Sequence, residues 1–268
     1  MSASRIEFNP LDISREAYRI VAAEKTKLLF AGGVFYLFAC LLLFFTKVSG
    51  DKSLMAMGDY GYSAAMFLGC QAVAMIACAK ALGVETPFLP SALLGDRTFW
   101  RFVAATLAGT AVAFLTGLAF LIVAAVIVPD PKALTSISQP EIAPVLAILG
   151  VGALAAGWVA LKATLMAPAI LLGEKVSVRA SWRRTRRMEF RLLAALVLTA
   201  ALLIVLQSLS RGYASYVGSP ELQVLAALFS TVVRLIQSAA CGALAGLVFA
   251  RLATFERAAA TVAVSREG

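Results

Sequence analysis

Six long apolar runs constrain this chain more than any other feature of its sequence. A helix needs about 20 residues, each rising 1.5 Å, to cross the roughly 30 Å hydrocarbon core of a bilayer. Five runs of 19 to 28 residues carry no charged side chain, and a sixth is interrupted only by Arg234. The predicted spans cover residues 28–46, 60–79, 102–128, 142–162, 192–210 and 224–250. The sequence therefore predicts an all-α bundle of six transmembrane helices.

Composition excludes a water-soluble fold of this size. Of the 268 residues, 61% are hydrophobic and only 15% are charged, and the mean hydropathy is +0.87. An average soluble domain carries about 25% charged residues. We expect an amphipathic N-terminal segment over 1–27, a transmembrane domain over 28–254 that includes a basic loop at 173–191, and a short tail over 255–268.

The distribution of Lys and Arg predicts the orientation. Counted between the spans, 18 of these cations fall on the side of the two termini and 4 on the other side. Cytoplasmic loops of membrane proteins carry the excess of Lys and Arg. Both termini and the basic loop are therefore expected in the cytoplasm, beside the inner membrane. The net charge of +9 is explained in the same way.

The basic loop contains the densest cluster of charge in the chain. Its apolar positions, Val178, Trp182, Thr185, Met188 and Leu192, share one face at helical spacing, which predicts an amphipathic helix at the membrane surface. Six guanidinium groups occupy the rest of the helix within thirteen residues. They belong to Arg179, Arg183, Arg184, Arg186, Arg187 and Arg191. Such groups either set the topology and anchor the chain to lipid in general, or select an anionic lipid or an acidic partner.

A similar module precedes the first span. Residues 15–19 resemble residues 179–183 at a constant offset of 164, and in both copies a basic residue and two leucines follow after seven residues. In the N-terminal copy, Ile13, Ala17, Ile20 and Val21 share one face. An internal repeat and chance similarity between two basic amphipathic stretches both fit this pattern.

Lys162 and Arg234 are the charges closest to the apolar runs. Each lies far enough along its helix to snorkel to an interface, about 30 Å from Ile142 for Lys162 and about 26 Å from Arg251 for Arg234. Alternatively Arg234, with Gln237 near it and with glutamines of other helices, lines a polar membrane cavity. The second interpretation predicts a transporter of small solutes or lipids.

Catalytic and cofactor chemistry find no support in the sequence. The chain has no histidine, its acids lie in loops and at span edges, and its four cysteines lie in apolar runs without metal-ligand spacing. We predict no enzyme activity, no metal or cofactor, and no nucleic-acid binding. Gly242 and Gly246 form a GxxxG pattern that favours close helix packing, either within one subunit or in a homo-oligomer.

One segment resembles a bacterial membrane family. The residues that carry the resemblance are Ala167-Pro168-Ala169-Ile170, Glu174, Val176, Ala180-Ser181-Trp182 and Thr185, with Leu11-Asp12-Ile13 near the start. The stretch of about 40 residues around them is similar to the membrane domain attached to some glycerophosphodiester phosphodiesterases, and to free-standing six-span inner-membrane proteins related to it. The resemblance implies architecture and a bacterial inner-membrane location. It supplies no catalytic residue, because only 18 residues follow Ala250.

These observations predict a non-enzymatic inner-membrane protein in an accessory or scaffold role. It engages anionic lipid, or a partner protein, through the arginine-rich helix. The transporter remains the alternative.

Overall fold

The computed structural model describes residues 9–49, 52–127, 139–163, 165–174, 177–186, 188–217 and 220–267. All regular structure in these ranges is helical. The helices are α1 (Pro10–Ala23), α2 (Lys25–Ser49), α3 (Lys52–Leu82), α4 (Pro90–Gly95), α5 (Arg97–Ile127), α6 (Gln139–Ala163), α7 (Met166–Leu171), α8 (Val178–Thr185), α9 (Glu189–Val217) and α10 (Pro220–Glu267). Within the described ranges, six helices are long and apolar enough to span a membrane. The predicted all-α fold and multi-pass membrane architecture are therefore confirmed.

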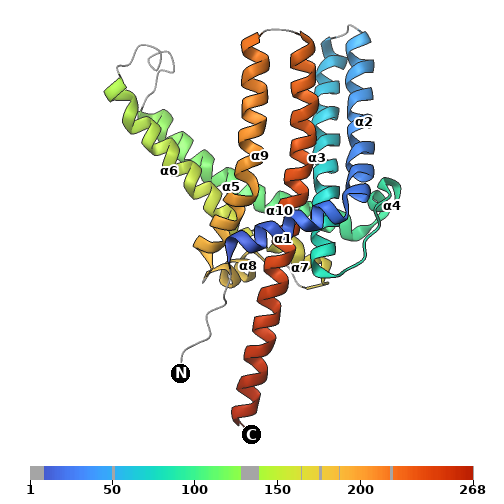
Figure 1. Ribbon diagram of the computed structural model, residues 1–268. Coiled ribbons are helices and arrows are strands. Elements are labelled where there is room, and N and C mark those ends of the chain that lie inside the picture. Colours follow the sequence, from blue (N-terminus) through green and yellow to red (C-terminus); the bar gives the residue numbers. More distant parts are fainter. Residues whose placement is uncertain are drawn as a thin grey trace.

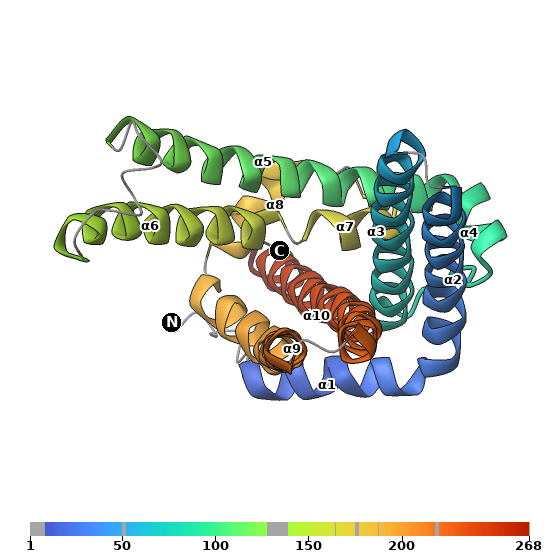
Figure 2. The ribbon, with the colours of Figure 1, turned by 90° about the horizontal axis from the view of Figure 1, so that it is seen from above.

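The long helices form two groups (Figures 1 and 2). Helices α2, α3, α9 and α10 stand upright and side by side, with α3 packed against both α2 and α10. Helices α5 and α6 form an antiparallel pair that leans away from these four. The short helices α1, α7 and α8 lie at one end of the molecule, which we call the base. Helix α10 continues past the base to Glu267, through the predicted tail.

The element order repeats one pattern three times. A short helix precedes a pair of long, mutually packed helices in α1–α2–α3, in α4–α5–α6 and in α8–α9–α10. The first and third of these units begin at the two similar sequence modules. In the second unit Phe99, near the start of α5, is fully buried.

Local sequence signals explain where several helices begin and end. The Asn9 side chain accepts a hydrogen bond from the backbone N–H of Leu11 at 3.1 Å and so caps α1. Ser177 caps α8 in the same way, accepting from the N–H of Ala180 at 3.1 Å. Gly83 and Gly173 follow α3 and α7 with φ near +71° and +72°, where a side chain would be strained.

Helix α1 lies across the base, and its apolar face is buried against the bundle. Ile13 and Ala17 are fully buried, as the spacing predicts, and α1 packs on α9 and α10. Ser14 donates to the carbonyl oxygen of Ala195 at 3.0 Å, and the Tyr18 hydroxyl donates to that of Thr199 at 2.5 Å. Burial raises the pKa of the Tyr18 phenol, so the hydroxyl stays a neutral donor.

Ion pairs of Glu16 and Glu24 tie α1 and its junction with α2 to the rest of the base. Glu16 binds Arg251 of α10 at 2.8 Å. Glu24, which separates α1 from α2, binds Lys80 at 2.9 Å and Lys27 at 3.0 Å. Hydrogen bonds from Lys80 and then from Lys27 hold the pKa of the Glu24 carboxyl below its ordinary value. Helix α1 is thus fixed by contacts with α3, α9 and α10.

Candidate functional site: the basic helix at the base

Helix α8 is shorter than the sequence predicts. The regular helix ends at Thr185, and α9 begins at Glu189. On its inner side Ser181 and Thr185 are buried, followed by Met188 and Leu192. Trp182, predicted on the apolar stripe, is 40% exposed, because Ser181 takes the inner position beside it. The polar Ser181 was missed, since a pattern of apolar residues gives no signal for a serine.

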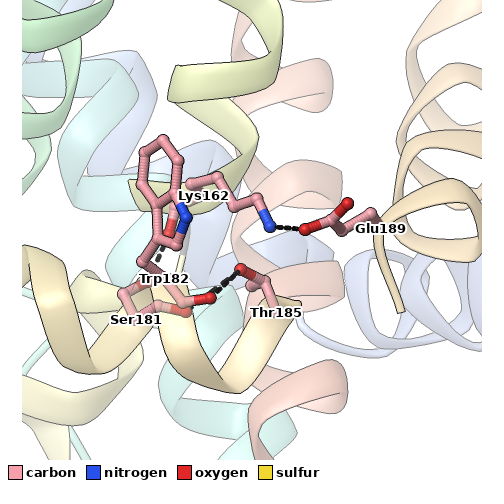
Figure 3. A network of polar contacts seen from close by, with 5 residues as sticks. All are labelled: Lys162, Ser181, Trp182, Thr185 and Glu189. Carbon is pink, nitrogen blue, oxygen red and sulfur yellow. Dashed lines mark hydrogen bonds and ion pairs between the residues drawn. The ribbon is translucent and has the colours of Figure 1, made fainter. Parts of the chain in front are cut away.

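A buried lysine holds this helix in place (Figure 3). The Lys162 side chain, at the end of α6, is only 1% exposed and forms an ion pair with Glu189 at the start of α9. Its ammonium nitrogen lies 5.2 Å from the ring centre of Trp158 and 5.4 Å from that of Trp182. Ser181 donates a hydrogen bond to the backbone carbonyl of Lys162. Lys162 therefore joins α6, α8 and α9.

This placement corrects the expectation that Lys162 snorkels to water. Distance along a helix gives the depth of a residue but not its neighbours, and here α8 and α9 cover the lysine. A charge removed from water needs an opposite charge close by, which Glu189 supplies. Glu189 lies in the predicted basic loop, and no pattern in the sequence pairs it with Lys162.

The arginines of the cluster divide into two kinds. Arg184 is 25% exposed, donates to Glu174 at 2.8 Å and stacks over the Phe249 ring of α10 at 5.0 Å. It therefore binds within the protein, which the sequence did not predict. Four others have exposed side chains: Arg179, Arg183, Arg186 and Arg191. Arg187 lies outside the described residues.

The remaining predicted site residues do not gather with Lys162. Arg234 is exposed on α10, and Gln237, one turn further, is partly exposed. A cavity of about 260 Å³ does lie between α3, α5, α10 and the junction of α6 with α7. Its described lining includes Gln71 but not Lys162, Arg234 or Gln237. The Gln207 side chain instead donates to Ser230 at 2.7 Å and joins α9 to α10.

Comparison with known proteins adds no relative: no protein-family model, no curated protein and no solved structure matches this chain.

The arrangement presents a cluster of positive charge at the base. Helix α8 is anchored from its inner side by Ser181 and Arg184, while Arg179 and Arg183 of the helix and Arg186 in the following turn have exposed side chains. Guanidinium groups present planar sets of donors that match phosphate oxygens. The site can therefore bind anions at the base of the molecule.

Proposed function

We propose that this chain is a non-enzymatic inner-membrane protein that binds anionic phospholipid headgroups through helix α8. The base lies at the cytoplasmic surface, and α8 rests there with its arginines among the phosphates of the inner leaflet. The exposed set of Arg179 and Arg183 on α8 and Arg186 directly after it carries this proposal, because the opposite side of the helix is fixed to the bundle.

The local surroundings of α8 suit a membrane surface. Trp182 is half-exposed beside these arginines, and tryptophan favours the headgroup region because its ring is apolar and its N–H is polar. Lys or Arg near an anionic leaflet contributes about 1 kcal/mol each. Because the α8 backbone is already ordered by contacts with α6 and α10, lipid binding does not have to order it.

Native mass spectrometry of the full chain tests this proposal. The protein is taken from nanodiscs that contain phosphatidylglycerol and phosphatidylcholine, and the lipids it retains are counted. Wild type is expected to retain phosphatidylglycerol preferentially. Arg183→Gln should weaken this retention by about fivefold, the effect of about 1 kcal/mol, and the triple variant with Arg179→Gln and Arg186→Gln should lose the preference.

Arg184→Gln is the matched control on the same helix. Its guanidinium is bound to Glu174 and Phe249, so its loss should lower the thermal stability and leave the lipid preference unchanged. Equal phosphatidylglycerol retention by wild type and the triple variant would refute the proposal. An acidic protein that co-purifies with wild type but not with the triple variant, without any lipid preference, would assign α8 to a protein partner instead.

A further inference from the structure

A five-residue pattern recurs in three helices with the same burial at each position. It consists of an arginine, two residues of any type, an aromatic residue and a second arginine, at residues 15–19 in α1, 97–101 in α5 and 179–183 in α8. We call it the arginine–aromatic motif. In each copy both arginines are exposed, the second residue is partly exposed, the third is buried and the aromatic ring is partly or fully exposed. The buried residues are Ala17, Phe99 and Ser181, and the aromatic residues are Tyr18, Trp100 and Trp182.

The same spacing occurs again at residues 187–191, but the surroundings there are different. Its third residue, Glu189, does not pack into the core and instead pairs with Lys162. Its first residue, Arg187, lies outside the described residues. The shared arrangement of an exposed arginine pair over a buried centre is therefore established for α1, α5 and α8.

The three copies lie on the same side of the membrane domain. Helices α2, α5 and α9 are the first, third and fifth of the six candidate spans in the described ranges, so alternate crossings bring their starts to one side. Helix α1 leads into α2 and α8 leads into α9, while the third copy begins α5 itself. Figure 1 shows α1 and α8 at the base, and α4, directly before α5, beside the lower end of α2. The motif therefore meets one membrane surface at three separate places.

The six arginines of these copies are not used inside the protein. Among the described residues, none of them forms an ion pair with Asp or Glu. Two neighbouring acids are engaged elsewhere, since Glu16 binds Arg251 and Asp96 accepts a hydrogen bond from the backbone at 2.8 Å. Asp12, exposed in the first turn of α1, lowers the net charge of that copy but does not cancel it. Each copy can therefore offer its charge to an anion outside the protein.

The spacing of the two arginines suits one phosphate group. Residues four positions apart on a helix are neighbours, with Cβ atoms about 5–6 Å apart. Two positive charges at this spacing repel each other, and a bound anion removes that repulsion. Guanidinium groups donate planar sets of hydrogen bonds that match phosphate oxygens. The aromatic ring beside the second arginine favours the depth of the headgroups, where the phosphates of lipids lie.

We infer that each arginine–aromatic motif binds the phosphate of one anionic phospholipid, so that the base holds three such lipids at defined places. The copies in α1 and α5 add two binding sites to the one on α8. Only the α8 copy rests on the function proposed above. The three sites lie on separate helices, so each binds its lipid without the others.

Native mass spectrometry of the full chain, from nanodiscs of phosphatidylglycerol and phosphatidylcholine, counts these sites. Wild type should retain three phosphatidylglycerol molecules in preference to phosphatidylcholine. Arg15→Gln with Arg19→Gln, and Arg97→Gln with Arg101→Gln, should each lower this number by one, because the loss of two cations weakens a site by about thirtyfold. All four substitutions together should leave one retained lipid, at α8. Because these arginines are exposed and outside the ion pairs described, the variants should unfold at the wild-type temperature.

Lys25→Gln combined with Arg234→Gln is the matched control, since it removes two exposed cations that belong to no copy of the motif. It should retain as many phosphatidylglycerol molecules as wild type. An equal loss in this control and in the motif variants would show that binding follows total charge, and would overturn the inference.

The α1 and α5 variants also separate this inference from the function proposed for α8. Wild-type retention in both variants would overturn the inference, and a loss confined to the α8 triple variant would leave the proposed function standing. Loss of one lipid in each of the α1 and α5 variants, with no effect of the α8 triple variant, would support the two added sites and refute the function proposed for α8.

Discussion

At the scale of single residues, the pair of Lys162 and Glu189 shows how one buried charge organises the base. Lys162 is 1% exposed and Glu189 is 20% exposed, so the two partners lose water unequally. Removing Glu189 leaves a lysine buried without its counter-charge, whereas removing Lys162 leaves a glutamate that still reaches water. Glu189→Gln should therefore destabilise the protein by about 3 kcal/mol, and Lys162→Met by less. Thermal unfolding in detergent measures both.

The double variant is the control for this prediction. Lys162→Met combined with Glu189→Gln removes both charges, and it should recover much of the stability lost in Glu189→Gln. Additive losses in the double variant would show that the two side chains act independently and would contradict the assignment of the pair as one unit.

Glu24 should make the base sensitive to acid. Its pKa is lowered in the folded protein by hydrogen bonds from Lys80 and Lys27, so its contribution to stability is complete above the ordinary carboxyl value of about 4.3. That contribution disappears as the pH falls from there through the lowered pKa. The difference in unfolding temperature between wild type and Glu24→Gln should accordingly be smaller at about pH 3 than at about pH 6. A difference that stays constant over this range would show that the carboxylate charge does not contribute.

At the scale of elements, the contact between α3 and α10 depends on two glycines. A Cβ atom on Gly242 would lie 2.2 Å from the carbonyl oxygen of Ala74, and one on Gly246 would lie 2.6 Å from that of Cys78. Both clashes involve backbone, which cannot move aside as a side chain can. Gly242→Ala should therefore force the helices apart and destabilise the protein by about 1–3 kcal/mol, measured by thermal unfolding.

Gly157→Ala in α6 serves as the control, because a Cβ at Gly157 meets nothing within 4 Å. It should be neutral or stabilising, since alanine favours a helix over glycine by about 1 kcal/mol. Equal effects at Gly157 and Gly242 would mean that the close approach of α3 and α10 does not decide stability.

Most elements could be predicted from the sequence, but their partners could not. The lengths of the runs without charged residues located the six spans, and the spacing of apolar residues located the buried face of α1. Both signals depend only on the local sequence. The GxxxG pattern predicted close packing and left open its partner; in the structure it packs within the chain, on α3. The contacts of Ser14, Ser181 and Arg184 depend on residues from 10 to 181 positions away, about which local patterns carry no information.

At the scale of the whole molecule, the outward lean of α5 and α6 also lay beyond prediction (Figure 2). The hydropathy of a helix specifies that it prefers lipid, but its tilt is decided by packing against neighbours. Here α5 and α6 pack mainly on each other, while the bundle core is concentrated at the base around Phe99 and Phe249. The cavity between α3, α5, α10 and the junction of α6 with α7 lies where this pair meets the upright helices, so its position could be found only from the folded chain.

The shared end of α1, α8 and the C-terminal half of α10 makes a prediction about topology that can be tested in intact bacteria. Two exposed serines can serve as labelling positions. Ser91 lies in α4, and Ser53 lies in the first turn of α3, at the end away from the base. If the base is cytoplasmic, a membrane-impermeant maleimide applied to whole cells should spare Ser91→Cys and label Ser53→Cys, in a background with the four native cysteines replaced by alanine. The Ser91 variant should become labelled once the inner membrane is permeabilised, which controls for thiol accessibility. Labelling of Ser91→Cys from outside would place the basic helix away from the cytoplasm. That result would rule out the anionic inner leaflet as the ligand of α8, because the excess of Lys and Arg would face the other side of the membrane.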